Sequence, residues 1–143
     1  MTDLPLSAAQ TILNAALTEA RRLDLKPVAV VVLDGRGAVK ATAAEDGTSL
    51  KRFEVAHGKA YGALALGMGS RAIGNRAVEQ PTFVAAVSHV VGGALVPAPG
   101  GVLAKAKDGR TVAAIGISGD TSDNDETCAK VGIETAGLTA ETG

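Results

Sequence analysis

Apolar and polar residues are arranged along this chain in two different patterns. Near the N-terminus, apolar residues return every three or four positions between residues 7 and 23, which predicts an amphipathic helix. Ser7 and Gln10 fit a capping box at its start, in which side chains bond the free backbone N–H groups. The apolar stripe consists of Ala9, Ile12, Leu13, Ala16, Leu17, Ala20 and Leu23.

Two other segments are apolar almost throughout and are short enough to be strands. They are residues 28–33 and 111–118, and both predict central strands that are covered on each face of a sheet. A glycine-containing turn at 34–37 leads from the first strand into a returning strand at 38–43. An Asp-Gly pair at 108–109, which tight turns favour, joins the second strand to the one before it. Two hairpins imply a mostly antiparallel sheet.

A second helix is predicted at residues 50–66, with Thr48 or Ser49 as its N-cap. This segment is apolar on nearly every side, and such a helix is expected to be buried nearly all round. Gly58 and Gly62 lie on one side of it. We expect this small-residue side to contact another helix, from this chain or from a second subunit.

The remaining elements are predicted from glycines, prolines and helix-capping residues. Glycines in 67–74 are expected to end the second helix, and Pro81 suits the first turn of a third helix that runs to about residue 90. Hydroxyl and acidic side chains at 121–126 favour the start of a last helix. The tail after Leu138 is expected to fray. Together these elements predict a single α/β (α+β) domain over the whole chain.

The bulk composition excludes several classes of protein. The chain has 143 residues with 14 basic and 15 acidic side chains, so it lacks the positive surface that nucleic-acid binding needs. No apolar segment is long enough to span a membrane, and no signal peptide is visible, so we expect a cytoplasmic protein. The single Cys128 excludes an intramolecular disulfide and is expected to be a buried, inert thiol.

The chain is rich in small residues, with 18 glycines, and its only aromatic residues are Phe53, Tyr61 and Phe83. A core with so few large side chains buries little area per residue. We therefore expect a homo-oligomer, in which subunit contacts supply further stability.

Four stretches together resemble one family, the haem-binding GlcG/HbpS-type proteins, which include the C-terminal domain of PduO. They read VAVVVLDGRGAV, DGTSLKRFEVAHGKAYGA, LVPAPGGVLAKAKDGRTVAAIGISG and DNDETCAKVG. The resemblance implies an antiparallel sheet of about five strands flanked by helices, similar to a profilin-like sandwich. It also implies assembly from dimers up to octamers and a gene in a catabolic operon. Haem is the cofactor that it makes plausible, and some members degrade haem with peroxide.

The chain departs from the family pattern at several positions. Ala44 stands where the family commonly has an arginine, and Arg52 where it usually has a serine. Leu103 stands where a proline usually follows the Gly-Gly-Val sequence. Asp120 replaces a glycine, whereas Lys59 matches the family's helix lysine. Several of these positions face the family's pocket, so the resemblance implies a shifted ligand preference.

His57 is the first candidate for site chemistry. Glu54 three residues earlier and Tyr61 four residues later lie on the same side of a helix, so the three can reach one spot. In the functional interpretation His57 is a general base or an axial haem ligand that Glu54 orients. The alternative is a core histidine bonded to a backbone carbonyl.

Arg52 and Lys59 are the candidate anion-binding residues, because two cations lie close together on the helical wheel. They would meet haem propionates or a small carboxylate; a solvated helix face or pairing with an acid is the alternative. Backbone N–H groups near Ser118 and Gly119 can also hold an anion.

Gly100 and Gly101 precede a strand rather than a helix, so they form no phosphate-binding loop, and we interpret them as a pocket rim. His89 is expected at the C-terminal end of the third helix, where a histidine interacts favourably with the helix dipole. Nothing in the spacing indicates a metal site.

Three functions remain open. The leading one is a small oligomeric protein that binds, and in some family members degrades, haem or a related planar carboxylated ligand. The second is a cytoplasmic catabolic enzyme, an isomerase or lyase acting on a small carboxylated intermediate, with His57 as base and Lys59 or Arg52 as anion anchor. The third is a binding or scaffold protein without catalysis.

Overall fold

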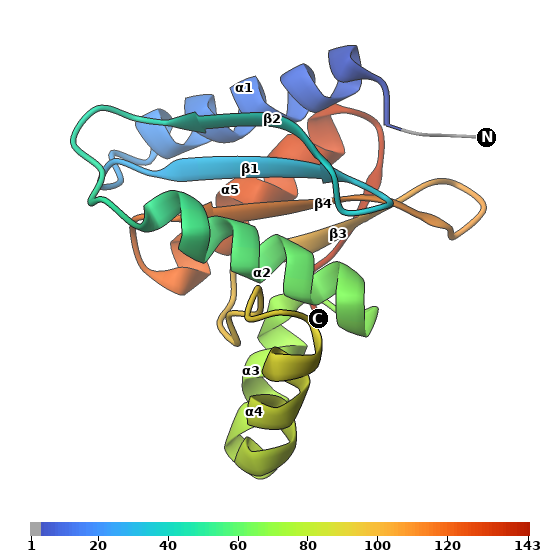
Figure 1. Cartoon of the computed structure of the whole chain (residues 1–143). Coiled ribbons are helices and arrows are strands. Elements are labelled where there is room, and N and C mark those ends of the chain that lie inside the picture. Colours follow the sequence, from blue (N-terminus) through green and yellow to red (C-terminus); the bar gives the residue numbers. More distant parts are fainter. Residues whose placement is uncertain (1–3) are drawn as a thin grey trace.

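The structure is a computed structural model that describes residues 4–143. Within these residues the chain forms five helices and five strands (Figure 1). In chain order they are α1 Leu6–Arg22, β1 Ala29–Asp34, β2 Val39–Ala44, α2 Arg52–Leu66, α3 Ser70–Glu79, α4 Pro81–Val90, β3 Gly101–Lys105, β4 Thr111–Ser118, α5 Ser122–Thr135 and β5 Thr139–Glu141.

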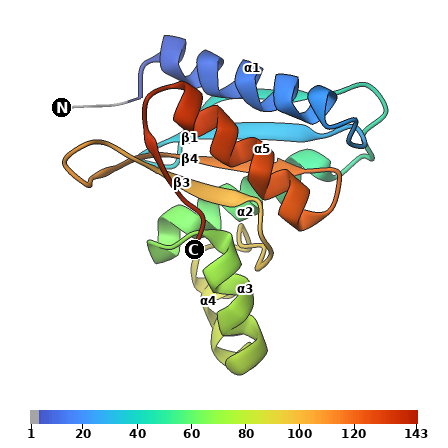
Figure 2. The ribbon, with the colours of Figure 1, turned by 180° about the vertical axis from the view of Figure 1, so that it is seen from behind.

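The five strands form one sheet in the order β2-β1-β4-β3-β5, and each neighbouring pair is antiparallel. Helices α1 and α5 cover one face, α2 crosses the other, and α3 and α4 project from the body as a helical hairpin (Figures 1 and 2). This confirms the predicted α+β class and the antiparallel sheet of five strands. No helix within residues 4–143 combines the length and the apolar character needed to cross a membrane.

The sheet is buried on both faces, which explains the unbroken apolar runs. Along β1, Val30 and Val32 pack with α1 and α5, whereas Val31 and Leu33 pack with α2. Successive side chains of a strand point to opposite faces, so a strand covered on both sides must be apolar at every position. The prediction of two central strands is therefore confirmed.

Helix α2 lies unusually close to β4. Gly116 on β4 faces α2, and a Cβ atom at this position would overlap the carbonyl oxygen of Ala56. Ala56, Ala60 and Ala63 supply the buried side of the helix. Small residues on both elements thus bring the backbone of α2 onto the sheet, and this fixes where its other side chains point.

The predicted helix starts are wrong at two positions. Helix α1 begins at Leu6 with Pro5 as N-cap, so Ser7 lies inside the helix and no capping box forms. Helix α2 begins at Arg52, and neither Thr48 nor Ser49 caps it. Neither helix start has a side-chain cap hydrogen bond, so both helices form without the predicted caps.

Glycine ends α2 as predicted, because Gly67 is its C-cap, but the two segments that follow helices α2 and α5 contain further elements. Residues 67–74 contain the start of α3, which begins at Ser70, directly after Gly69. The tail after Leu138 forms β5, which pairs with β3 through Ala140 and so satisfies backbone groups at the sheet edge. The predicted fraying is wrong for this reason.

The expectation that α2 is buried nearly all round is also wrong. Its Phe53 side is open to solvent, with 38% of that residue exposed. The glycine side contacts a loop of the same chain rather than another helix, because Gly58 and Gly62 lie against Leu95 and Val96. The predicted start of α5 is confirmed, since the Thr121 hydroxyl accepts a hydrogen bond from the Asn124 N–H.

Candidate functional site

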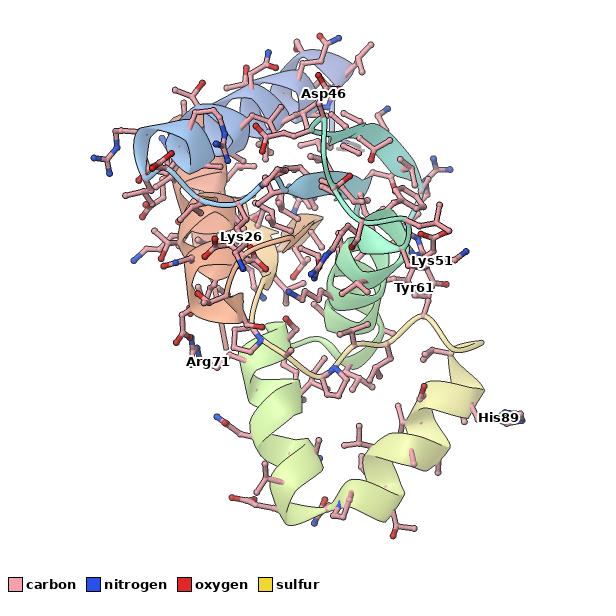
Figure 3. The ribbon with its side chains drawn as sticks, turned by 90° about the vertical axis from the view of Figure 1, so that its left-hand side faces the viewer. Lys26, Asp46, Lys51, Tyr61, Arg71 and His89 are labelled. Carbon is pink, nitrogen blue, oxygen red and sulfur yellow. The ribbon has the colours of Figure 1, made fainter. Side chains whose placement is uncertain are left out.

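The outward side of α2 carries a row of three stacked rings. Phe53, His57 and Tyr61 follow at intervals of four residues, with ring centroids 5.9 Å and 5.5 Å apart and planes tilted by 23° and 21°. Side chains four residues apart share one side of a helix, which produces this row. Tyr61 lies on the side of α2 that faces away from α5 (Figure 3). We call these three residues the ring row.

His57 is half-buried in the middle of the ring row. Its ring nitrogens have no hydrogen-bond partner among residues 4–143, so the alternative interpretation as a core histidine bonded to a carbonyl is wrong. Glu54 is exposed and forms an ion pair with Lys51 at 3.4 Å instead of a hydrogen bond with His57. The imidazole is thus held by ring stacking and keeps its nitrogens available.

The inward side of α2 carries Lys59, only 3% exposed. Its Nζ donates to the carbonyl oxygen of Ile117 at 2.9 Å and to Oδ2 of Asp125 at 3.3 Å, which joins α2 to β4 and α5. Burial lowers the pKa of Lys59, and the nearby Asp125 carboxylate partly offsets this effect. Burial likewise raises the pKa of Asp125, against the influence of Lys59.

Gly100 and Gly101 lie directly against this lysine. Gly100 has φ +123°, and a Cβ there would come within 2.8 Å of Lys59 Nζ, while a Cβ at Gly101 would overlap the Lys59 carbonyl. The Gly101 N–H donates to the buried Ser70 hydroxyl at 2.7 Å. Close packing against α2 explains both glycines, and their role at a ligand rim stays a prediction.

Arg52 lies at the start of α2, where it reaches the end of β4. Its Nη1 donates to the Ser118 hydroxyl at 3.1 Å and its Nε donates to the Ser49 hydroxyl at 3.1 Å. Beside it is a hollow of about 200 Å³, continuous in its lining with a neighbouring one of about 270 Å³. We call the two together the Arg52 hollow, lined by Lys26, Pro27, Gly47, Thr48, Ser49, Arg52, Gly119, Asp120 and Thr121.

Asp120 closes one edge of the Arg52 hollow and is tied to its surroundings. Its carboxylate accepts hydrogen bonds from Asn124 Nδ2 at 2.8 Å, from the Lys26 N–H at 2.9 Å and from the Thr121 N–H at 2.8 Å. These hydrogen bonds, that from the Asn124 side chain first, lower the pKa of Asp120 to about 2. The carboxylate therefore stays charged at neutral pH.

Two further candidates lie away from these groups. His89 is exposed in the last turn of α4, and its side chain points away from the body (Figure 3). Cys128 is buried, as predicted, and burial raises the pKa of its thiol to about 12, with Glu19 and the acids near α5 adding to the effect.

The structure divides the candidate residues into three groups around α2. His57, Tyr61 and Glu54 lie on the outer side of α2. Lys59 is buried against Gly100 and Gly101 and bonds the carbonyl of Ile117 on the central strand β4, one residue before the Ser118 that Arg52 contacts. Arg52, Ser118 and Gly119 form the third group, at the Arg52 hollow. At about 100° per residue, Arg52 and His57 are roughly 140° apart around the helix.

Sequence reasoning missed Lys26 and identified Asp125 only as a helix-capping residue. Lys26 meets Asp120 across 94 positions of sequence, and Asp125 meets Lys59 across 66. No local pattern signals either pairing. A lone lysine before Pro27 and an acid in a helix's first turn are both ordinary surface features in sequence.

The chain is similar to one known family and to several solved structures. The family model described as "Haem degrading protein HbpS-like" matches residues 4–134. Curated proteins yield no significant match. Among solved structures, the crystal structure of HbpS is 28% identical, with 94% of this chain and 90% of that chain covered and a TM-score of 0.81.

Two more structures share the fold. The PduOC:heme complex is 24% identical over 96% of this chain and 97% of that chain, with a TM-score of 0.84. Klebsiella pneumoniae protein ORFY is 20% identical over 96% and 93%, also with a TM-score of 0.84. Because the family model spans nearly the whole chain, this protein belongs to the HbpS-like family of haem-degrading proteins.

Proposed function

We propose that this protein binds haem, or a related planar carboxylated ligand, against the outer side of α2, with His57 as the residue that meets the iron. The observation that carries the proposal is a half-buried imidazole held between two aromatic rings, whose nitrogens have no hydrogen-bond partner in the described part of the chain. The family membership supports haem as the ligand. Degradation of the bound haem is part of the same proposal.

The residues present fit a haem group. An imidazole nitrogen without a partner is an established iron ligand, and Tyr61 places a phenol four residues away. Phe53 adds an exposed apolar ring beside His57, which suits the edge of a porphyrin. When bound, haem supplies a redox-active iron; the chain supplies the ligand atom and the apolar surroundings.

A second copy of the chain would complete this site. The ring row has protein on one side only, so a flat ligand there stays half in water unless another subunit covers it. Helix α4 supports assembly: seven of its ten residues in PTFVAAVSHV are apolar, yet only Val84 is buried, and Val90 is 81% exposed. We therefore propose a homo-oligomer, between dimer and octamer. A cytoplasmic location stays a prediction.

Titration with haemin tests the proposal. We expect wild-type protein to shift and sharpen the Soret band with saturation, and His57→Ala to weaken binding by about tenfold or more because the iron loses its ligand. Tyr61→Phe keeps the ring and removes the hydroxyl, which separates stacking from a role of the phenol. His89→Ala is the control for the second histidine, which is exposed on α4, and it is compared with His57→Ala at the same oligomeric state, measured by size-exclusion chromatography.

The titration has two outcomes that count against the proposal. A wild-type protein without a Soret shift would remove haem as the ligand and leave the binding or scaffold alternative. Equal effects of His57→Ala and His89→Ala would remove the assigned site. The isomerase or lyase alternative is not favoured, because Lys59 is bonded to Asp125 and Arg52 lies on another side of α2 than His57.

A further inference from the structure

The geometry points to a second binding site in this chain, separate from the ring row: we propose that the Arg52 hollow binds a small oxyanion, a carboxylate or a phosphate, independently of haem. The proposal goes beyond the haem function and does not depend on it. It stands on the charge, the rigidity and the size of the hollow.

The charge comes from two cations on different elements. The guanidinium of Arg52 is fixed by its hydrogen bonds to Ser49 and Ser118, and its Nη2 has no partner among residues 4–143. The ammonium group of Lys26 has no ion-pair partner in the same part of the chain, although its backbone N–H is bonded to Asp120. An oriented guanidinium fork beside an ammonium group is the usual donor set for carboxylates and phosphates.

One carboxylate also borders the hollow and has to be weighed. Asp120 carries a negative charge, but three N–H donors, from Lys26, Thr121 and Asn124, already bond its oxygens. With Lys26 and Arg52 facing it, the local balance is two positive charges to one negative charge. The hollow therefore keeps positive charge available for a ligand.

Hydrogen bonds fix the residues that line the hollow in the absence of a ligand. Ser118 is 1% exposed, and the carbonyl before it, that of Ile117, accepts the hydrogen bond of Lys59. The Asp120 N–H donates to Oδ1 of Asp125 at 3.1 Å, which fixes the connection from β4 to α5. Binding to prearranged donors loses less conformational entropy, so a small ligand can bind measurably.

Size selects the ligand class. The part of the hollow beside Arg52 has a volume of about 200 Å³, which is room for inorganic phosphate or a short dicarboxylate. Hydroxyl groups of Thr48 and Thr121 line the hollow and can add hydrogen bonds.

The same residues indicate binding rather than catalysis. The lining contains no histidine, and the pKa of Asp120, about 2, makes it a weak base at neutral pH. The hollow thus has anion donors without a proton acceptor suited to neutral pH.

Calorimetric titration of the full chain at low ionic strength tests the site, with inorganic phosphate and succinate as the probes. We expect saturable binding of at least one probe, which identifies the class. Arg52→Gln should weaken it about tenfold, because the guanidinium fork is lost, and Lys26→Gln by about threefold. Lys107→Gln is the matched control, since this exposed lysine lies in the β3–β4 turn and should leave the affinity unchanged.

Two results would overturn the site. The first is that neither probe binds saturably. The second is an equal loss of affinity in Arg52→Gln and Lys107→Gln, which would mean that only the overall charge matters. Circular dichroism and thermal melting show whether Arg52→Gln folds; if it does not, Lys26→Gln decides.

The two proposed functions can fail separately. His57→Ala should keep oxyanion binding, and Arg52→Gln should keep the Soret shift with haemin. A loss of haemin binding alone would contradict the ring-row proposal and leave the Arg52 hollow standing. Loss of both activities in Arg52→Gln, with the fold intact, would contradict the claim that the sites are independent.

Discussion

His57 and Lys59 are two residues apart on the same helix and lie in opposite surroundings. His57 is half-buried between two rings, and its nitrogens are unpaired among residues 4–143. Lys59 is buried and bonds Ile117 and Asp125. Both are polar groups on an apolar helix, and sequence alone presents both as site candidates.

The difference teaches which polar groups remain free for function. A buried charge must be paired, and removing its partner is costly, so Lys59 is committed to holding α2, β4 and α5 together. A ring on the surface contributes little to stability and stays free to meet a ligand. The four predictions below test this contrast between a structural and a functional side of α2, from the largest expected effect to the smallest.

Breaking the buried pair should have the largest effect. Lys59→Met leaves the Asp125 carboxylate buried without its cation, and we expect a loss of about 3 kcal/mol in the free energy of unfolding, measured with urea. Lys51→Met is the matched control: the same substitution at an exposed pair with Glu54 should cost less than about 0.5 kcal/mol. Equal losses in both variants would contradict a structural role for Lys59.

Adding Asp125→Asn to the Lys59→Met variant sharpens the same test. The double variant removes the uncompensated carboxylate, so its loss should be smaller than the sum of the two single losses. Additive losses would mean that the two side chains are not coupled.

Widening the gap between α2 and β4 should have the next effect. Gly116→Ala places a methyl group against the Ala56 carbonyl, and the required backbone shift should cost about 2 kcal/mol in urea unfolding. Gly35→Ala is the control, because its added Cβ would be in ordinary contact, at 3.4 Å, with the Thr111 carbonyl. If Gly116→Ala is as stable as Gly35→Ala, the close approach of the helix does not matter for stability.

Acid should weaken the loop at the Arg52 hollow. The folded-state pKa of Asp120, about 2, lies below its ordinary value of 3.8, so its hydrogen bonds stabilise the protein above about pH 4 and lose this effect as pH falls towards 2. Partial exposure reduces the contribution to about 1 kcal/mol. Asp120→Asn should lower stability at pH 7 and flatten its pH dependence between pH 4 and 2. An unchanged acid profile would contradict this assignment.

The outward side should show the smallest change in stability. His57→Ala removes two ring contacts at a half-exposed position, and we expect a loss of about 0.5 kcal/mol in thermal or urea unfolding. The same variant should lose most of its haemin affinity. A stability loss as large as that of Lys59→Met would make His57 a structural residue and would contradict the difference proposed between His57 and Lys59.

The sheet was largely predictable from the sequence. Strand β4 has the predicted bounds, Thr111–Ser118, because a segment covered on both faces must be apolar throughout and the pattern is local. Helix α4 was found from Pro81 and its apolar run, and the start of α5 from the Thr121 hydroxyl. The family was recognisable from short motifs in the chain, which the match over residues 4–134 confirms.

Other features were decided by tertiary contacts. Helix α3 exists although glycines precede and interrupt it, because Ser70 bonds the carbonyl of Ala98 and Gly74 lies against Pro97. Strand β5 forms because the edge of β3 offers unpaired backbone groups. Neither signal is present within the segment itself.

For the candidate site, sequence determined which residue types lie on α2 and how they are spaced, so the stacking of rings four residues apart could be expected. Only the tertiary structure decided that His57 faces outward, that Lys59 meets Asp125, and that Lys26 joins Arg52 beside one hollow. The physical reason is that helical spacing is a local property. The direction in which a helix turns its polar groups depends on how closely small residues let it approach the sheet, and those residues come from distant parts of the chain.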